Sequence, residues 1–323
     1  MTQPKITGKI VNDNAKVWEW RIQEEVDNVE MTVALPALNA NKIIWLALES
    51  LKNQKNVNFK WELICIEDHG HSRKIFAGYK GKLPNCVRMK HVSVDPIKES
   101  RYKEGNLKHK YLLLDKWSNI AKMASAKSKI FVMHAIDDYS APKRLYIHYE
   151  HFKNPDCYFS TQLKGVFYNI KTRLKMFYNG SKIDPPITNS LSKASYFSKN
   201  HLNMALRLHD MKRIAPAQKN SGIDGHIFKA IADLNKINFS EKKHNFLDSE
   251  IDNNNWKYAL FTDGYNNISH GRKNVYEEIK KPTVKPGLKV WDPFNKKFMQ
   301  KYGYKGMCKY IPFYVVKRLL EMK

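Results

Sequence analysis

The feature that most constrains the fold is an alternation of short apolar segments with amphipathic ones in the first half of the chain. Short apolar segments rich in β-branched residues predict strands, and apolar residues that recur on one helical face predict helices. The predicted strands cover residues 31–35, 59–66, 87–94 and 130–133, and the predicted helices cover residues 42–53, 112–126 and a segment from Lys143. Pro36 is expected to end the first strand. This alternation predicts an α/β fold with a largely parallel sheet.

The composition is that of a folded protein with a strongly positive charge. The chain has 323 residues, of which 42% are hydrophobic, so one large domain or two small ones can bury a sizeable core. Lys and Arg number 56 against 31 Asp and Glu, and the formal net charge of +25 favours a polyanionic partner, either nucleic acid or an anionic membrane surface. An AT-rich genome also encodes many Lys, Asn and Ile residues without selection for binding, and this alternative stays open.

The cysteines and the hydropathy indicate a soluble protein of a reducing compartment. Cys65, Cys86, Cys157 and Cys308 are widely separated and lack the Cys-x-x-Cys spacing of zinc sites, so we expect reduced core thiols. No apolar run reaches the roughly 18 residues of a membrane-spanning helix, and the first residues do not form a hydrophobic signal segment. We therefore expect a cytoplasmic location.

Two adjacent carboxylates, Asp137 and Asp138, follow the predicted strand at residues 130–133 and precede a helix. Ligands of open α/β sheets bind beyond the carboxyl ends of such strands. Hard divalent ions such as Mg²⁺ bind one or two carboxylates together with substrate phosphates. The pair therefore predicts a metal–diphosphate site, and the alternative is a turn in which an Asp caps the following helix.

A second acidic pair, Glu67 and Asp68, ends the predicted strand at residues 59–66. A carboxylate in this place often accepts hydrogen bonds from the ring or ribose of a nucleotide. The glycine-rich fingerprint of dinucleotide-binding folds is absent from the chain, so NAD is not expected.

Four elements come in a fixed order along the chain: Pro36-Ala-Leu-Asn39, a helix with Ala47-Leu-Glu-Ser-Leu51 and Gln54, a strand ending in Glu67-Asp68, and Ile136-Asp137-Asp138 with Pro142 and Leu145. This ordered set resembles the family-2 inverting glycosyltransferases of the GT-A fold, in which the same elements occur at about these spacings. The resemblance is good over residues 30–148 and looser over residues 149–275. It implies a Rossmann-like, mostly parallel central sheet flanked by helices.

The chain departs from this family in two places. Many members carry Asp-x-Asp-Asp where this chain has Ala135-Ile136-Asp137-Asp138, so the first acid is absent, although some members use the later pair alone. The usual Asp-Asp after the second strand is Glu67-Asp68 here, which keeps the charge.

The resemblance implies how a UDP-sugar donor would bind its base. Asp68, together with Glu67, would contact the uracil, and the backbone around Pro36, Ala37 and Leu38 would lie beside the ring.

The resemblance also implies a divalent metal, Mg²⁺ or Mn²⁺, at the diphosphate. Asp138 and Asp137 would bind the metal, and Asp137 would also face the ribose or the sugar. His270 is similar to a histidine that some relatives place near the metal, and Arg272 would pair with phosphate. The alternative for His270 is an exposed loop residue.

Asp224 directly precedes a predicted helix at residues 227–234. In the family, an acidic residue at about this distance serves as general base, and an inverting transfer needs a carboxylate that takes the proton of the acceptor hydroxyl. The alternative is that Asp224 only caps its helix. His226 has no comparable match, and we expect it at the surface.

The second half of the chain has weaker signals. We expect strands at residues 156–161, 166–170 and 256–262, the first two as a candidate hairpin, and helices at residues 195–208, 227–234 and 311–322. The predicted organisation is an N-terminal extension (1–29), a nucleotide-sugar-binding half (30–150), an acceptor half (151–272) and a basic aromatic C-terminal extension (273–323). Lysines interleaved with aromatic residues in this extension suit a nucleic-acid groove. They suit an anionic membrane surface nearly as well, and the third reading is a tail packed by its aromatic residues on the catalytic domain.

The sequence thus predicts a metal-dependent, inverting glycosyltransferase that uses a UDP-sugar. For the acceptor, the charge favours double-stranded phage DNA with hydroxylated or hydroxymethylated pyrimidines, whose target base would leave the stack. One alternative is a cytoplasmic-face transferase for surface polysaccharide or lipopolysaccharide, held peripherally on anionic lipid. The other is a catalytically inactive nucleic-acid-binding protein on the same scaffold, which the missing first acid keeps open.

Overall fold

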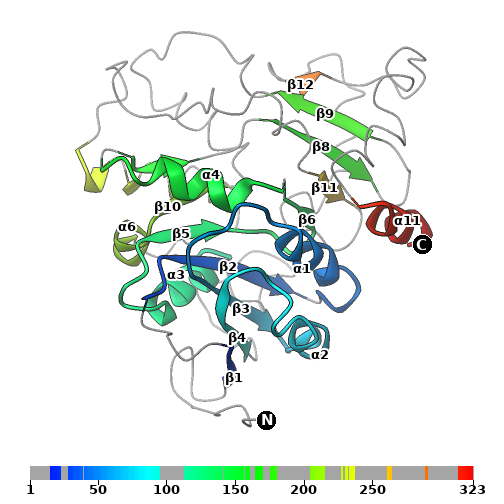
Figure 1. The fold of residues 1–323 in the computed structure, drawn as a ribbon, viewed down its shortest axis with the longest axis horizontal. Helices are drawn as coiled ribbons and strands as arrows, with labels where there is room; N and C mark the ends of the chain where they lie inside the picture. The colour runs from blue at the N-terminus through cyan, green and yellow to red at the C-terminus, as the bar shows by residue number, and fades with distance from the viewer. Residues whose placement is uncertain are drawn as a thin grey trace, which may run out of the picture.

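The computed structural model describes residues 15–22, 28–38, 40–94, 113–140, 142–155, 157–160, 164–169, 175–179, 204–214, 227, 230–231, 233–236, 260–263, 288–289 and 312–322. The elements within these residues form two sheets with helices packed around the first (Figure 1).

The first sheet has seven strands in the order β1-β4-β3-β2-β5-β10-β7. Its centre is parallel and consists of β4 (Cys86–Val94), β3 (Trp61–Asp68), β2 (Met31–Leu38) and β5 (Ile130–Met133). This is the mostly parallel α/β sheet that the sequence predicts, with four of the expected strands in place.

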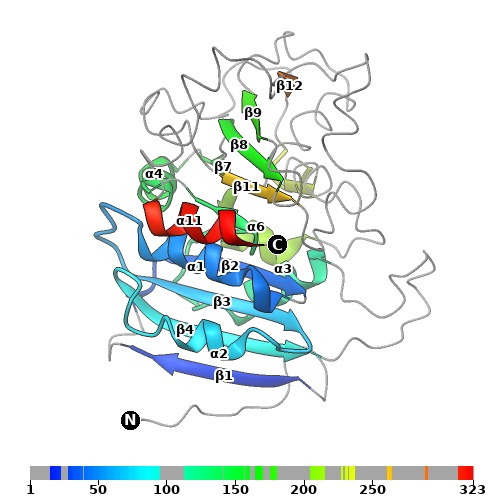
Figure 2. The same ribbon diagram turned by 90° about the vertical axis from the view of Figure 1, so that its right-hand side faces the viewer.

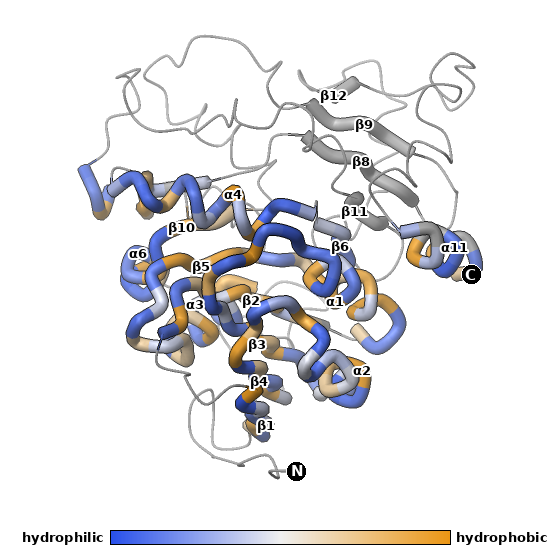
Figure 3. The backbone as a smooth tube through the Cα atoms, viewed as in Figure 1, coloured by the Kyte–Doolittle hydropathy of each residue, from blue (hydrophilic) through white to orange (hydrophobic). Residues whose placement is uncertain are grey.

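Helices cover both faces of this parallel centre. The helices α1 (Ile44–Lys52), α2 (Arg73–Ala77) and α4 (Arg144–His151) pack on one face, and α3 (Leu113–Met123) and α6 (Leu208–Arg213) pack on the other. Along β3, Leu63 and Cys65 point into the first of these cores, and Ile64 and Ile66 point into the second. Because both faces are covered, β2, β3 and β5 are apolar on both faces over most of their length, as Figure 3 shows, and β3 ends in the acids Glu67 and Asp68.

Antiparallel strands extend the sheet at both edges. β1 (Lys16–Arg21) pairs with β4, so part of the segment predicted as an N-terminal extension belongs to the central sheet. At the other edge, β10 (Ala205–Arg207) lies between β5 and β7 (Phe159–Ser160).

The position of β10 corrects the helix expected at residues 195–208. Within the described residues, residues 205–207 form a strand, and the helix α6 begins only at Leu208. Ala205 contributes to the core on one face of the sheet and Leu206 to the core on the other. Pairing with β5 and burial on both faces outweigh the local helical pattern.

The second sheet has the order β12-β9-β8-β11-β6. Its strands are β6 (Asp138–Tyr139), β8 (Lys164–Asn169), β9 (Lys175–Asn179), β11 (Leu260–Asp263) and β12 (Leu288–Lys289). The hairpin considered for residues 156–161 and 166–170 does not form, because β7 joins the first sheet and β8 pairs antiparallel with β9.

Pro36 does not end β2, contrary to the expectation from the sequence. β2 continues to Leu38, which pairs with Asp68 of β3. On its other side, β2 pairs with β5 only as far as Ala34. Pro36 has no partner in β5, so its missing backbone N–H interrupts no hydrogen bonds between β2 and β5.

The terminal helix α11 (Phe313–Glu321) lies beside α1 (Figure 2). Val315 and Leu319 are buried against Ile43, Trp45 and Tyr139, and the helix expected at residues 311–322 is confirmed over Phe313–Glu321. The helix predicted at residues 227–234 is confirmed at the described positions 227, 230, 231, 233 and 234.

The described cysteines behave as the sequence predicts. Cys65, Cys86 and Cys157 are buried free thiols, and Cys308 lies outside the described residues. None of the helices in the described part of the chain has the length and apolar character needed to span a bilayer.

Candidate functional site

The strand order creates a switch point between β2 and β5. After β2 the chain adds β3 and then β4 on one side, and it returns to place β5 on the other side of β2. Open α/β sheets bind ligands outside the carboxyl ends of the strands at such a point. The candidate site is therefore the carboxyl edge formed by β2, β3 and β5.

The first wall of this site is the end of β2 beside the end of β3. Ala37 pairs with Glu67 and Leu38 pairs with Asp68, so the backbone at residues 36–38 and both acids predicted for the base lie on one edge. The backbone register of β2 with β3 places these residues side by side, independently of any contact between their side chains.

Asp68 is fully buried and forms an ion pair with Lys116 of α3. The Lys116 Nζ lies 2.9 Å from Asp68 Oδ2 and donates to the Ala37 carbonyl oxygen at 2.6 Å. Burial raises the pKa of Asp68 and lowers that of Lys116, and the attraction between the two charges opposes both shifts. Asp68 Oδ1 is buried and accepts no hydrogen bond from the described residues, which leaves an acceptor for an N–H donor.

Lys116 is a site residue that the sequence analysis did not single out. It is buried and shares a helical face with the apolar residues Leu113 and Ile120, three and four positions away. A lysine on the buried face of an amphipathic helix is the signal that could have identified it, since such a charge is rarely buried without a partner.

Glu67 uses its carboxylate to hold the surrounding turns. Oε2 accepts hydrogen bonds from the Ser72 backbone N–H at 2.8 Å and hydroxyl at 2.7 Å and lies 3.1 Å from His91 Nε2, while Oε1 accepts from Ala40 N at 3.2 Å. Burial alone would raise the pKa of Glu67, but the hydrogen bonds from His91 and Ser72 outweigh it and the pKa is lowered. Both oxygens are engaged, so Glu67 shapes the site by fixing the turns after β2 and β3.

The second wall is the segment 134–139 after β5, which we call the acid loop. Asp137 and Asp138 are buried there, with exposed fractions of 7% and 2%. Asp138 begins β6 and pairs with Phe261 of β11, so the acid pair lies where the first sheet meets the second.

Among the described residues, few side chains are placed to ligate a cation. These residues contain no cluster of three or more His, Cys, Asp or Glu side chains with metal-binding geometry. Two neighbouring carboxylates nevertheless fit a hard divalent ion that takes its other ligands from a diphosphate and water. Asp224, His226, His270 and Arg272 lie outside the described residues, so their predicted roles stay predictions.

No known family and no curated protein matches this sequence. Among solved structures, S. aureus TarS is 13% identical with a TM-score of 0.40 and aligns over 73% of this chain and 36% of its own. S. aureus TarS 1-349 in complex with UDP-GlcNAc is 17% identical with a TM-score of 0.40, over 63% of this chain and 53% of its own. The 4-diphosphocytidyl-2C-methyl-D-erythritolsynthase of Anaerococcus prevotii is 8% identical with a TM-score of 0.39, over 76% of this chain and 92% of its own.

The chain thus spans between about a third and about half of the TarS chains to which it is similar. Similarity at this level of identity and superposition does not establish an activity.

Proposed function

We propose that this protein is a glycosyltransferase that moves a sugar from a UDP-sugar to an acceptor hydroxyl with inversion at the anomeric carbon. The observation that carries the proposal is the buried Asp68–Lys116 pair beside the end of β2, at the same sheet edge as Asp137 and Asp138. A nucleotide with its base at Asp68 and its diphosphate at the acid loop would bridge the switch point.

The base end of the proposed site has the polarity of a pyrimidine ring. Asp68 Oδ1 is an unused acceptor that suits the ring N–H of uracil, and the backbone of Pro36, Ala37 and Leu38 would flank the ring. The ammonium group of Lys116 lies 2.9 Å from Oδ2, so it favours the charged form of the carboxylate and directs it. Glu67 supports this end through the turns that it holds.

At the diphosphate end, Asp137 and Asp138 would hold Mg²⁺ or Mn²⁺, with His270 and Arg272 as further proposed contacts. A bound divalent ion stabilises the negative charge that develops on the departing UDP. Asp137 would also face the ribose or the sugar, which places the reacting carbon beyond the acid loop.

The proposed general base is Asp224. Its carboxylate would take the proton of the acceptor hydroxyl while the hydroxyl oxygen attacks the anomeric carbon from the face opposite UDP. The bond from that carbon to the diphosphate oxygen breaks, and UDP leaves with the electron pair. One displacement of this kind inverts the configuration.

For the acceptor we favour hydroxylated or hydroxymethylated pyrimidines of double-stranded DNA, because the net charge of +25 suits a polyphosphate. A surface polysaccharide or lipopolysaccharide acceptor is the second candidate. Its supporting observation is the outer face of α11, where Lys317 and Arg318 are exposed and basic and suit the headgroups of anionic lipid.

UDP binding measured by calorimetry tests the donor site. We expect UDP to bind the full chain, and Asp68→Asn to weaken it about tenfold, because the uracil N–H would then donate to a neutral amide oxygen instead of a charged carboxylate. The matched control is Glu150→Gln, a carboxylate on α4 whose partner is the partly exposed Lys153 at 2.7 Å. Undiminished affinity in Asp68→Asn, or no UDP binding by the unaltered protein, would refute the site.

A transfer assay separates the acceptors. Radiolabelled UDP-sugars are offered with Mn²⁺ or Mg²⁺ to hydroxymethylated duplex DNA, to an oligosaccharide and to a lipid-linked glycan. Product on the duplex supports the DNA proposal, and product on the glycans alone refutes it. Salt-sensitive DNA binding without any sugar release would favour the inactive binding protein.

A further inference from the structure

Arg144, the first residue of α4, is buried behind the acid loop with an exposed fraction of 3%. All three nitrogens of its guanidinium donate hydrogen bonds within the protein. Nη2 donates to the Met133 carbonyl oxygen, Nη1 to Ser140 Oγ at 2.9 Å and Nε to His148 Nε2 at 3.2 Å. Met133 is the last residue of β5 and Ser140 directly follows β6, so one planar group holds the acid loop at both ends.

The charge of Arg144 acts on the same loop. Burial lowers the pKa of Arg144 to about 9, and the attraction of Asp138 opposes that shift. The guanidinium remains protonated at neutral pH and gives Asp138 a fixed cation on the protein side.

A relay of hydrogen bonds holds Arg144 in turn. Since Nε2 of His148 accepts from Arg144, the neutral ring carries its proton on Nδ1, which donates to Ser160 Oγ at 2.7 Å. The Ser160 hydroxyl is then the donor to Nδ1 of His151 at 2.6 Å. His148, His151 and Ser160 are all buried, which keeps both rings neutral by lowering their pKa values.

This relay joins parts of the fold that are separate along the chain. Ser160 belongs to β7 at the edge of the first sheet, His148 and His151 lie one turn apart on α4, and Arg144 reaches the loop that enters the second sheet. The direction of each hydrogen bond is set by the one before it, so the whole relay has one arrangement.

We infer that Arg144 is a positioning residue for the acid loop, held by the relay His148–Ser160–His151. The inference rests on the proposed function, because the acids that it orients are those proposed to hold the metal and the diphosphate. A planar fork with three fixed donors can hold both ends of the loop, whereas the single ammonium group of a lysine can hold one of them. The orientation of Asp137 and Asp138 should therefore depend on the shape of this side chain as well as on its charge.

The test compares UDP binding with and without Mn²⁺, together with kcat and KM for the UDP-sugar, in Arg144→Lys, Arg144→Met and Ser160→Ala. We expect Arg144→Lys to bind UDP alone as the unaltered protein does, since Asp68 and Lys116 are untouched. The gain in affinity from Mn²⁺ and the kcat should both fall at least about tenfold, as expected for misplaced reacting groups, with little change in KM. Arg144→Met should be no better than Arg144→Lys.

Ser160→Ala removes one hydroxyl, keeps Arg144 and should lower kcat in the same direction by a smaller factor. Arg207→Lys is the matched control. Arg207 also donates to two backbone carbonyls, those of Cys157 and Pro155, and stacks on Tyr158, but it pairs with Ile130 at the opposite end of β5. We expect it to lower the melting temperature and leave kcat unchanged.

The outcomes separate the inference from the proposed function. Absence of UDP binding by the unaltered protein refutes the proposed function and the inference with it. Normal kcat and a normal Mn²⁺ gain in Arg144→Lys refute the inference alone. A fall of kcat that merely follows the melting temperature across all variants, Arg207→Lys included, also refutes it.

Discussion

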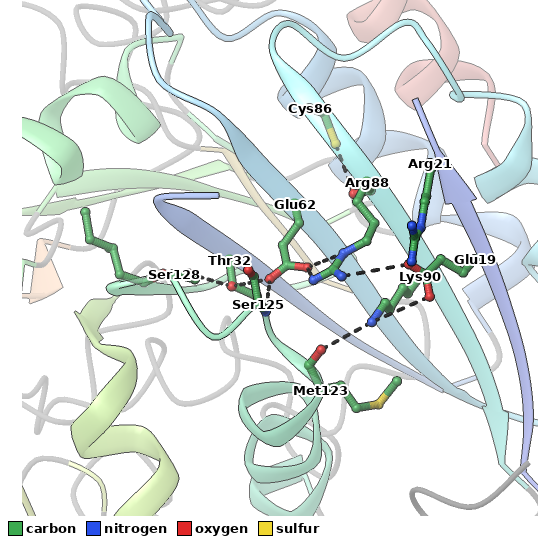
Figure 4. Close-up of polar contacts among 11 residues, drawn as sticks. Glu19, Arg21, Thr32, Glu62, Cys86, Arg88, Lys90, Met123, Ser125 and Ser128 are labelled. Carbon is green, nitrogen blue, oxygen red and sulfur yellow. Dashed lines mark hydrogen bonds and ion pairs between the residues drawn. The ribbon is translucent and has the colours of Figure 1, made fainter. Parts of the chain in front are cut away.

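Among single residues, two buried carboxylates lie near opposite ends of β3. At the carboxyl end, Asp68 keeps one carboxylate oxygen without a described partner. Near the amino end, every lone-pair direction of Glu62 is used. Its Oε1 accepts from Thr32 Oγ1 at 2.8 Å and Ser125 N at 2.7 Å, and its Oε2 accepts from Arg88, as Figure 4 shows. The first arrangement is suited to a ligand and the second to stability.

Glu62→Gln tests this distinction. It leaves Arg88 buried without its main counter-charge, so we expect the free energy of unfolding to fall by about 3 kcal/mol. Urea denaturation measures the loss, and calorimetry should find UDP affinity unchanged because Glu62 lies near the other end of β3. A matching loss of UDP affinity would show that the two ends are not independent.

Lys116→Met should destabilise the protein by about 3 kcal/mol or more, because it leaves the Asp68 carboxylate buried without its cation. Adding Asp68→Asn removes that unpaired charge, so the double variant should be more stable than Lys116→Met alone and still bind UDP poorly. Lys122→Met, on an exposed position of the same helix, is the control and should change stability little. Additive losses in the urea denaturation of the double variant would contradict the ion pair.

The buried histidines predict a pH dependence of stability. Burial lowers the pKa of His148, aided by Arg144 and His151, and burial lowers the pKa of His151, opposed by Glu150. As the pH falls below the ordinary histidine value of 6.5, the unfolded chain takes up protons that the folded one does not, so stability must decrease.

We expect the loss to reach up to about 1.4 kcal/mol per pH unit for each histidine. Urea denaturation between pH 7.5 and pH 5.5 measures it, and His151→Gln should flatten the slope. An unchanged slope in that variant would mean that folding does not lower the pKa of His151, contrary to its burial.

Among the elements, α11 is the one for which the structure adds most to the sequence-based prediction. Of the readings for residues 273–323, packing against the folded domain holds for α11, where Val315 and Leu319 bury against α1 and Tyr139. Tyr314 donates to Glu49 and accepts from Asn53 at 3.2 Å, and Arg318 lies over the Trp45 ring at 4.1 Å. Since Tyr139 directly follows Asp138, α11 packs against the end of the acid loop through Tyr139.

Leu319→Ala should lower the free energy of unfolding by about 2–4 kcal/mol, as expected for a fully buried leucine. Lys317→Ala on the outer face of α11 removes only a surface pair with Glu321 at 3.9 Å and should cost less than about 0.5 kcal/mol. Equal effects in thermal denaturation would show that α11 is not docked on α1 in solution.

For the whole molecule, the charge of +25 makes a prediction about ionic strength. If duplex DNA is the acceptor, its affinity should fall by roughly 10³-fold or more between 50 and 200 mM salt, because counterions return to the phosphates. Fluorescence anisotropy of a labelled duplex measures this, and sedimentation with anionic vesicles is the parallel measurement. Binding to the vesicles without binding to the duplex would move the acceptor to the membrane-bound glycans.

The sequence and the structure agree best where the evidence is local. The segments at residues 31–38, 61–68 and 130–133 are largely apolar over lengths typical of buried strands, and residues 86–94 carry Arg88 and Lys90 among apolar residues. The helices α1 and α3 show their helical period directly. The acids at the strand ends were therefore expected at one edge of a parallel sheet, and the register of β2 with β3 confirms this for Asp68.

The sequence-based predictions and the structure differ where the pairing of segments far apart in sequence decides the secondary structure. Residues 205–207 look helical by themselves and become a strand because β5 and β7 offer ladder partners on both sides. Residues 16–21, predicted as part of an N-terminal extension, become an edge strand on β4. In the same way, Lys116 and Arg144 gain their roles from partners that the sequence does not place near them.

The amino-acid sequence by itself determined the α/β class, the succession of strands and helices along the first half of the chain, and the acids at the carboxyl ends of the strands. Hydrophobic periodicity is a property of neighbours along the chain, so a local pattern is enough to predict these features. Only the tertiary structure decided which strands pair across the sheet edges, which oxygen of Asp68 remains for a ligand, and how Arg144 and its relay hold the acid loop. These depend on contacts between residues far apart in sequence, whose energies no local pattern contains.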